Sequence, residues 1–394
     1  MSSSSMERRI LVLTSLAHLF THLMMLVYPT IAVVQAKEWG MDVADLLSLT
    51  FPGFLLYGLG SLPAGYWSDR NQGGVPLIIG LLGMAGGAFV CSVADQPWEI
   101  AFGLGIIGLF GSIYHPAGLG LISRGVKRSA WALGINGVFG SGAVAIAPAL
   151  AEILSEWVGW RTTWIIIAVP ALIVAVVFLF LPIRIDSAPQ DEPSTSPEPA
   201  EATRLWTPSF VILCIAMTLG GIAYRGNSII LPTLMNERVS FIGHGVATSI
   251  TYAFAMIMNY LSGRLSERYS PSIVFLYLVS LSLPPLILTA WLSGIPLLLV
   301  AAIYGGFALG TQPAENTIVA QLSPKRLRGV AYGFKFMLAF GVGALVIPVV
   351  SHLLKNYGLE TVQLTMAGVV GMLVLVVVAV HQRHKTHAAE TTSS

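Results

Sequence analysis

Three charged side chains in this sequence lie where charge is costly. Arg225, Glu315 and Lys335 each fall inside a long apolar segment, whereas nearly all other Asp, Glu, Lys and Arg residues lie in polar stretches or at segment ends. Inside a membrane-spanning helix, an ionisable side chain is tolerated when it faces a water-filled cavity or pairs with a partner. We therefore expect these three residues to line a cavity or to form ion pairs.

Arg225 has the chemistry to bind an anionic ligand, because a guanidinium can donate two parallel hydrogen bonds to a carboxylate, a phosphate or a phosphonate. If every histidine is neutral, Arg225 and Lys335 oppose only Glu315, so a cavity lined by all three would be positive. Such a cavity would favour an anionic substrate. The alternative is a structural role, in which Arg225 pairs with backbone carbonyls or with Glu315.

Glu315 and Lys335 could reach each other. Glu315 lies about seven residues before a predicted turn at Ser323, which places it roughly 10 Å into the membrane at about 1.5 Å per residue. Lys335 lies at a similar depth beyond Arg328. Glu315 is therefore a candidate to carry a coupling proton, with Lys335 tuning its proton affinity. Alternatively, Glu315 only neutralises Lys335 or Arg225.

Histidines form a second group of candidates. His18 and His22 are four residues apart and share one helical face, and His18 could take part in proton coupling because histidine titrates in the accessible range. This spacing can also hold a metal, and Met24, Met25 and His115 could complete a soft site. No cysteine or carboxylate lies nearby, so we expect no resident metal and keep metal or metal-chelate transport as an alternative. His115 could instead bond a carbonyl that is freed by the neighbouring Pro116.

Membrane helices must position these residues. The 394-residue chain is 55% hydrophobic and 10% charged, against roughly 25% charged residues in soluble domains. Its mean hydropathy is +0.76. A helix needs about 20 apolar residues to cross a bilayer, and twelve segments meet that length. They cover residues 10–33, 43–67, 74–94, 99–123, 129–154, 161–183, 208–235, 243–267, 271–293, 295–322, 328–354 and 361–382.

The predicted fold is therefore all-α and integral to the membrane, with two six-helix bundles at residues 1–183 and 208–394 and a short tail. Residues 184–207, rich in Pro, Ser and Glu, predict a disordered cytoplasmic linker. With both termini and this linker on one side, that side receives fifteen Lys and Arg residues and the other receives four. The excess predicts that both termini are cytoplasmic.

The two bundles repeat in sequence. GYWSDR at 65–70 is followed 198 residues later by GRLSER at 263–268. YHPAG at 114–118 corresponds to TQPAE at 311–315, and HLMMLVYPTI at 22–31 aligns with RGNSIILPTL at 225–234. This alignment makes His22 the counterpart of Arg225 and His115 the counterpart of Gln312. The predicted substrate-binding set is Arg225, His22, His115, Gln312, Asn316 and Asn227.

Two parallel six-helix repeats are the architecture of the major facilitator superfamily, which this sequence resembles. GYWSDRNQGG is similar to the superfamily's signature loop, although Asn71, Gln72 and Gly74 stand where basic residues are usual. The resemblance implies a substrate site near mid-membrane between the halves. It also implies that residues at the cytoplasmic helix ends gate the transporter. The predicted gating residues are Asp69, Arg70, Glu267 and Arg268.

Within the superfamily, the polar residue before YPTI, the His-Pro-Ala-Gly motif and the Arg ahead of Pro-Thr-Leu resemble the fosmidomycin-resistance-like exporters. The glycine-rich segment at 129–154 loosely resembles a motif of antiporters in the superfamily, but it lacks the Gly-Pro pair. The resemblance implies export of a small organic anion or drug against proton influx. Uptake of a metabolite anion by proton symport, and a transport-inactive sensor on the same fold, are the alternatives.

Other classes of protein are disfavoured. The sequence has no G-x-x-x-x-G-K-[ST] phosphate-binding motif and no long soluble segment, so we expect neither an enzyme nor a nucleotide cofactor. Charge lies in short runs and not on one basic face, which argues against a nucleic-acid partner. The expected protein is a multi-pass monomer of a bacterial-type inner membrane, with protons, lipid and a small molecule as its partners.

Overall fold

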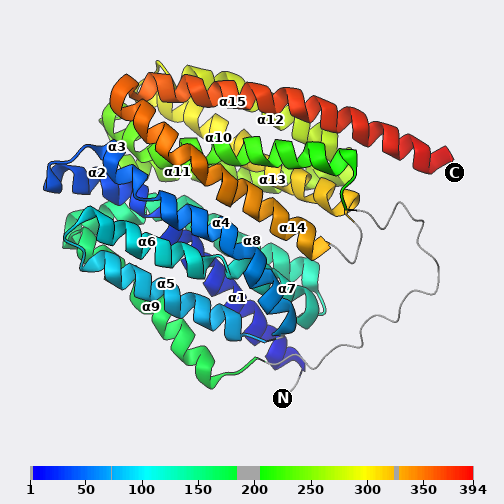
Figure 1. The fold of residues 1–394 in the computed structure, drawn as a ribbon, viewed down its shortest axis with the longest axis horizontal. Helices are drawn as coiled ribbons and strands as arrows, with labels where there is room; N and C mark the ends of the chain where they lie inside the picture. Colours follow the sequence, from blue (N-terminus) through cyan, green and yellow to red (C-terminus); the bar gives the residue numbers. More distant parts are fainter. Residues whose placement is uncertain (1–2, 72, 184–204, 324–327, 394) are drawn as a thin grey trace. The chain divides into compact units, whose positions relative to one another are not determined.

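The chain folds into two compact units, Met1–Pro197 and Glu198–Ser394. The computed structural model describes residues 3–71, 73–183, 205–323 and 328–393, and Figure 1 shows their course. Fifteen α-helices, α1 to α15, form within the described residues. The predicted linker at 184–207 lies almost entirely outside these residues, so its disorder and the predicted domain boundaries stay predictions.

The first unit contains nine helices in its described residues, and they form six spans. Three of the predicted spans are each divided between two helices. The helices are α1 (Ser3–Leu26), α2 (Tyr28–Trp39), α3 (Val43–Ser48), α4 (Phe51–Arg70), α5 (Val75–Ser92), α6 (Pro97–Gly111), α7 (Tyr114–Gly125), α8 (Ser129–Val158) and α9 (Trp160–Phe180).

Prolines account for two of these divisions. Pro29 lies in the first turn of α2, and Pro116 lies in the first turn of α7. A proline inside a helix removes a backbone donor and clashes with the carbonyl four residues earlier. The helix therefore breaks just ahead of each proline, at Val27 and at residues 112–113. The first and fourth spans are thus discontinuous, and both carry histidines on the turns beside the break.

The second unit has fewer breaks in its described residues. Its helices are α10 (Pro208–Arg238), α11 (His244–Arg268), α12 (Pro271–Leu288), α13 (Gly294–Leu322), α14 (Arg328–Phe336) and α15 (Val346–Ser393). A π-helical segment, η3 (Met337–Val342), and a 3₁₀ turn, η4 (Gly343–Leu345), join α14 to α15. The orange-to-red helix of Figure 1, α15, packs against α10 and α12.

Ten helical stretches within the described residues are long and apolar enough to cross a membrane. The last, Val330–Arg383, bends at Gly358, where φ is 80°, and so contains two spans. The more polar α11, which has 25 residues, completes the twelve. The predicted all-helical membrane fold is therefore confirmed, and helix bounds differ from the predicted ones mostly at the ends.

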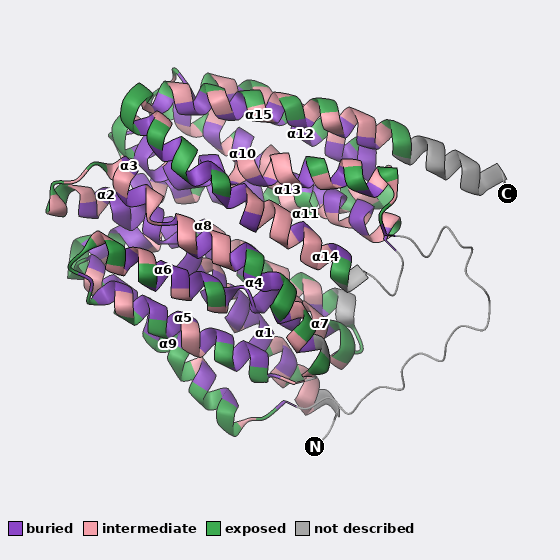
Figure 2. Cartoon of the chain, in the orientation of Figure 1, coloured by how far each residue is buried: buried purple, intermediate pink, exposed green. Residues whose placement is uncertain are grey.

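Helix α9 shows the pattern expected of a surface that faces lipid. It buries Trp160 and Trp164, whereas Ile173 and Phe180 are exposed along its length. Figure 2 shows this alternation of buried and exposed positions on α9. Apolar side chains with no protein neighbours are stable in hydrocarbon, so this face is suited to contact with acyl chains.

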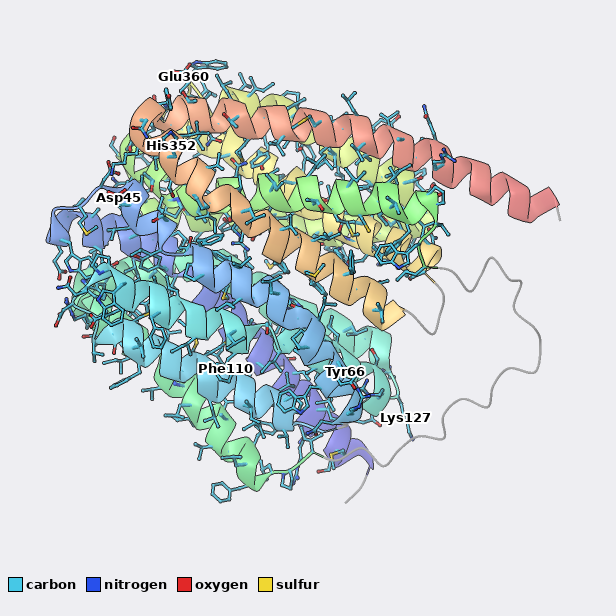
Figure 3. All side chains as sticks on the ribbon, in the orientation of Figure 1. Asp45, Tyr66, Phe110, Lys127, His352 and Glu360 are labelled. Atoms are coloured by element: carbon cyan, nitrogen blue, oxygen red, sulfur yellow. The ribbon has the colours of Figure 1, made fainter. Side chains whose placement is uncertain are left out.

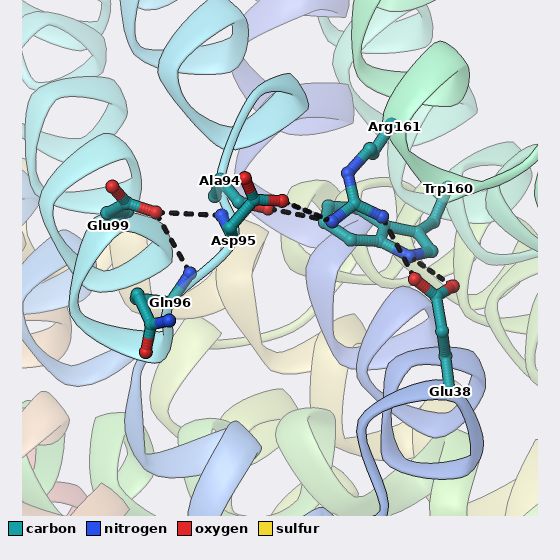
Figure 4. A network of polar contacts seen from close by, with 7 residues as sticks. All are labelled: Glu38, Ala94, Asp95, Gln96, Glu99, Trp160 and Arg161. Carbon is teal, nitrogen blue, oxygen red and sulfur yellow. Dashed lines mark hydrogen bonds and ion pairs between the residues drawn. The ribbon is translucent and has the colours of Figure 1, made fainter.

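A polar network ties three helix ends together in the first unit (Figure 4). The guanidinium of Arg161 contacts the carboxylates of Glu38 and Asp95, each at 2.9 Å, and donates to the carbonyl of Ala94 at 3.1 Å. The indole of Trp160 donates to the other oxygen of Glu38 at 2.7 Å. Arg161 also lies 4.2 Å from the ring centroid of Trp160. The ends of α2, α5 and α9 are thereby held together.

In the second unit the corresponding helix ends are also held together, but the arginine and the glutamate have exchanged places between the first and the last span. Arg238, at the end of α10, donates to the carbonyls of Thr289 and Ala290 in the turn after α12. Trp291 in the same turn donates to Glu360 at 2.6 Å. Figure 3 labels Glu360 just after the bend in α15. Arginine thus lies on the first span of this unit, whereas in the first unit it lies on the sixth.

Candidate functional site

Three histidines of the first unit converge. His18 and His22 lie on successive turns of α1, and His115 lies in the first turn of α7. The Nε2 atoms of His18 and His22 are 3.1 Å apart. The ring centroid of His115 lies 5.5 Å from that of His18 and 5.7 Å from that of His22. The structure thus brings together three residues that are up to 97 positions apart in the sequence.

Asn136 on α8 fixes the orientation of His18. The Nδ1 atom of His18 lies 2.9 Å from the backbone carbonyl of Asn136 and 3.1 Å from its side-chain oxygen. Tyr114 donates its hydroxyl to the same side-chain oxygen at 2.7 Å. Carbonyl oxygens can only accept hydrogen bonds. The Nδ1 atom of His18 therefore carries a proton, and its Nε2 atom faces His22.

Packing confines the His18 ring on two further sides. The ring of Tyr114 stacks on it, with centroids 4.4 Å apart and an interplanar angle of 20°. Gly140, one turn beyond Asn136 on α8, supplies the remaining room. A Cβ atom at Gly140 would lie 2.2 Å from Cε1 of the His18 ring. The site therefore requires glycine at this position.

Arg225 in the second unit lies in the middle of α10 and is only 3% exposed. Its guanidinium carbon is 5.6 Å from the ring centroid of Tyr224. Tyr252 on α11 lies within electrostatic range of both residues and of Tyr304 on α13. Tyr224 and Tyr252 thus lie beside Arg225, and Tyr304 lies beside these two tyrosines. The three aromatic side chains come from three helices, and each has a hydroxyl group.

The predicted ion pair between Glu315 and Lys335 is present. Lys335 on α14 lies 2.8 Å from the carboxylate of Glu315 on α13, and both side chains are buried. Lys335 also donates to the side-chain oxygen of Asn316, whose backbone carbonyl accepts a hydrogen bond from Tyr332 at 3.0 Å. The pair therefore belongs to a network that links α13 to α14.

This network lies next to the π-helical segment η3, which begins two residues after Lys335. Such segments occur mostly as single turns within α-helices, frequently at functional sites. Gly221 on α10 lets η3 approach closely, because a Cβ atom there would lie 2.4 Å from the carbonyl oxygen of Ala339. Gly221 lies one turn before Arg225, so this contact positions the turn of α10 that carries the arginine.

Other predicted site residues lie in varied environments. Gln312 is exposed, whereas Asn227 is buried and donates to the carbonyl of Ala223 in its own helix at 2.9 Å. The predicted gating residues lie at the ends of α4 and α11. Their surroundings give no test of gating.

Each described gating residue is exposed. The guanidinium of Arg70 lies 3.5 Å from the ring centroid of Tyr66, which Figure 3 labels. Glu267 lies 3.9 Å from Arg264 of its own helix, and Arg268 is also exposed. The side chain of Asp69 lies outside the described residues. The gating assignment therefore stays a prediction.

Several polar residues beside His18 and Arg225 were not among the predicted site residues. Tyr224 and Tyr114 directly precede Arg225 and His115 in the chain, and this adjacency could have identified both tyrosines as candidate site residues. Asn136 is a polar residue within a glycine-rich apolar segment, and it could have been singled out by the same cost argument as the charged residues. Tyr252 and Tyr304 have no comparable sequence signal, because tyrosine is also common at membrane interfaces.

The helical fold, the polar clusters inside apolar helices and the sequence repeat together define a multi-pass membrane transporter. The sequence pattern described as Major Facilitator Superfamily matches residues 10–237 and 213–393. The chain belongs to this superfamily, and it is accordingly a secondary transporter of small molecules and not an enzyme. The resemblance to the superfamily is confirmed, whereas the fosmidomycin-resistance-like subgroup stays a prediction.

Characterised relatives share moderate similarity. The chain is 28% identical to a gentisate transporter of Corynebacterium glutamicum over 371 residues, which cover 85% of this chain and 78% of the relative. It is 24% identical to the multidrug resistance protein MdtG of Proteus mirabilis over 328 residues, which cover 79% of this chain and 80% of the relative. The substrates in these two names are those of the relatives.

Solved structures share the fold. A bacterial homologue of the human lysosomal transporter Spinster, in an inward-facing unoccupied conformation, matches with a TM-score of 0.77 and 16% identity over 96% of this chain and 97% of its own. A POT family transporter in complex with 5-aminolevulinic acid matches with a TM-score of 0.76 and 13% identity over 95% and 96%. At these identities the likeness concerns the fold alone.

Proposed function

We propose that this protein is a proton-coupled transporter that exports a small organic anion by alternating access. The observation that carries the proposal is the buried guanidinium of Arg225, which lies beside Tyr224 and Tyr252, with Tyr304 next to these two tyrosines. A buried guanidinium has a strong requirement for an anionic partner, and its planar fork matches a carboxylate. Arg225 is thus the proposed contact for the anionic group of the substrate.

The tyrosines narrow the proposed substrate class to aromatic acids. Aromatic side chains pack against aromatic ligands in offset or edge-to-face geometry, and tyrosine hydroxyls can exchange hydrogen bonds with ring hydroxyls. A hydroxybenzoate offers both features together with a carboxylate. The similarity to a gentisate transporter supports this class, because gentisate is a dihydroxybenzoate. The similarity to MdtG proteins supports export as the direction.

Glu315 is the proposed carrier of the coupling proton. Its carboxylate is paired with Lys335 at 2.8 Å, and separation of these two side chains is the proposed step at which a proton takes the place of the ammonium group. Proton binding and release would then follow changes in the α13 and α14 contact. His22 and His115, with His18 beside them, are proposed to shape the site on the first unit or to take up protons there.

Further parts of the proposal rest on sequence alone. They are an inner-membrane location with both termini cytoplasmic, a monomeric transporter, substrate contacts by Gln312, Asn316 and Asn227, and gating by Asp69, Arg70, Glu267 and Arg268. The excess of Lys and Arg on one side of the predicted spans supports the orientation.

A binding assay with purified protein tests the substrate class. We expect gentisate and related hydroxybenzoates to quench intrinsic tryptophan fluorescence saturably, and cationic drugs to have no effect. Arg225→Lys should weaken binding at least tenfold, because it retains charge but loses the planar fork. Tyr252→Phe should weaken binding of hydroxylated acids more than that of benzoate.

Tyr260→Phe is the matched control for Tyr252→Phe, since Tyr260 lies on the same helix and is exposed. Its binding curve should coincide with that of the wild type. Unchanged affinity in Arg225→Lys, or saturable binding of cations alone, would contradict the assignment of Arg225 as the anion contact.

A further inference from the structure

Histidine is the commonest metal ligand among protein side chains. The three histidines of the first unit bring ring nitrogens, which are the metal-binding atoms, close to one another. One nitrogen from each of His18, His22 and His115 lies within 4.8 Å of the other two. The three residues come from two helices that pack against each other, α1 and α7. We propose that these residues form a binding site for one divalent transition-metal ion of the Zn²⁺ class.

The Nε2 atoms of His18 and His22 are already close to the spacing that a metal requires. Zinc binds imidazole nitrogens at about 2.0–2.1 Å in tetrahedral geometry, which places two such nitrogens roughly 3.3 Å apart. The observed separation is 3.1 Å. For the other pairs, rotation of the rings has to close a gap of at most about 1.5 Å, because all three nitrogens lie within 4.8 Å of one another.

The hydrogen bonds of His18 are those of a metal ligand. Ligating histidines almost always donate their other ring N–H to a carbonyl or a carboxylate, which fixes the tautomer and orients the lone pair. Nδ1 of His18 donates to the two oxygens of Asn136. Its Nε2 atom is therefore the one that faces His22. With His18 protonated at Nδ1, neutral His22 donates its Nε2 proton to Nε2 of His18. When the proton of His22 lies on Nδ1 instead, both Nε2 lone pairs can bind one cation while both imidazoles stay neutral.

The ring of His18 cannot turn away easily. Tyr114 stacks on one face, and the backbone of Gly140 lies close enough that a Cβ atom there would overlap the ring. Preorganisation of this kind lowers the cost of assembling ligands around an ion.

The expected metal and its fourth ligand follow from the ligand types. Three neutral imidazoles suit Zn²⁺, Co²⁺, Ni²⁺ or Cu²⁺, whereas Mg²⁺ and Ca²⁺ prefer oxygen ligands. The three ligands carry no negative charge, so the bound ion would keep its full charge of about +2. A charge of this size between membrane helices favours an anionic fourth ligand, which could be a hydroxide or a carboxylate. This inference does not rest on the proposed transport function, because it concerns binding alone.

The test is a metal titration of the purified full-length protein after chelator treatment and removal of any affinity tag. His384 and His387 in the C-terminal tail are changed to Gln in every sample, so that the tail cannot bind metal. We expect one Co²⁺ per chain with the visible absorption of tetrahedral coordination, and displacement of Co²⁺ by Zn²⁺. His115→Gln and His22→Gln should each weaken binding at least tenfold.

Glycine variants provide a matched pair on one helix. Gly140→Ala should weaken Co²⁺ binding at least tenfold by displacing the His18 ring, whereas Gly137→Ala should not, because no atom lies within 4 Å of a Cβ there. His352→Gln, at an exposed position of α15, should also leave binding unchanged. Monodisperse elution and a cooperative thermal transition establish that each variant is folded.

X-ray absorption of the Zn²⁺-loaded chain that carries only the two tail substitutions keeps the test independent of variants at the site. Scattering from three imidazole rings per zinc is the expected result. The proposal is overturned if the chain with only the two tail substitutions binds neither Co²⁺ nor Zn²⁺, or if a variant that also lacks His18, His22 and His115 binds the same number of ions with the same affinity. A failure of anion transport would leave these readouts unaffected.

Discussion

Lys335 and Glu315 form a buried ion pair, with 2.8 Å between the ammonium nitrogen and a carboxylate oxygen, and their side chains are 7% and 12% exposed. Two adjacent helices in the second unit, α13 and α14, supply the partners. Because neither charge is well solvated, the stability of each depends on the other. This dependence leads to the first prediction.

Removal of one member of the pair should destabilise the protein more than removal of both. Lys335→Met leaves the Glu315 carboxylate buried without its cation, which should cost about 3–5 kcal/mol of the free energy of unfolding. Glu315→Gln together with Lys335→Met removes both charges and should restore much of this loss. The measurement is the thermal unfolding midpoint in detergent for each single variant and for the double variant.

Lys355→Met serves as the control because Lys355 is exposed on α15. Its midpoint should stay at the wild-type value. If the double variant were less stable than either single variant, the pair would be contributing independent contacts and not a coupled interaction.

Close packing of α10 against the π-helical segment leads to a second prediction. Gly221→Ala places a Cβ atom 2.4 Å from the carbonyl oxygen of Ala339, so the two backbones must separate. Overpacking of this kind typically costs about 1–3 kcal/mol. The displacement should also move the turn that carries Arg225, and we expect lower thermal stability together with weaker anion binding.

Gly220 offers a control one residue away. A Cβ atom there would lie 3.8 Å from the end of the Leu373 side chain, which is an ordinary contact. Gly220→Ala should therefore have the stability and the anion affinity of the wild type. Equal effects of the two substitutions would show that general helix propensity, and not the contact with Ala339, determines the result.

The network around Arg161 leads to a third prediction, concerning salt. Its ion pairs with Glu38 and Asp95 are partly exposed, with side-chain exposures of 38%, 46% and 81% for the three residues. Surface pairs contribute about 1 kcal/mol or less each, and salt screens them. Arg161→Gln should therefore lower the unfolding midpoint modestly, and the difference from wild type should shrink as ionic strength rises.

Arg264→Gln is the comparison for this network. Arg264 is exposed and lies 3.9 Å from Glu267 within one helix. Its replacement should cause no measurable change at any salt concentration. A salt-independent loss in Arg161→Gln would instead indicate that its hydrogen bond to the carbonyl of Ala94, or its contact with Trp160, dominates.

Span positions were predictable because the length of an apolar segment is a local property of the sequence. Helix α10, for example, was predicted at 208–235 and is observed at Pro208–Arg238. The breaks ahead of Pro29 and Pro116 were not predicted. The presence of a proline alone does not predict a break, because α10 and α13 continue across Pro232 and Pro313. Whether a proline divides a helix depends on how neighbouring helices satisfy the freed backbone groups.

The candidate sites were predictable where desolvation of charge provides a strong signal. This argument identified Arg225, Glu315 and Lys335 and the pairing of the last two. The neighbours of Arg225 and His18 could not be predicted from the cost of burying charge, because tyrosine and asparagine are uncharged and are tolerated in many membrane environments. Their roles depend on which helices are neighbours, as Tyr252 on α11 and Asn136 on α8 illustrate.

The central claim is proton-coupled export of an anion through Arg225 and Glu315, and a proton assay in energised everted membrane vesicles tests it most directly. Gentisate added to vesicles that contain the wild-type protein should release protons from the acidified lumen. Vesicles with Arg225→Ala or Glu315→Gln at equal protein levels should show no release. Further acidification of the lumen on addition of gentisate would instead indicate proton symport. Silence to every carboxylate, with proton release on addition of cationic drugs, would contradict the account.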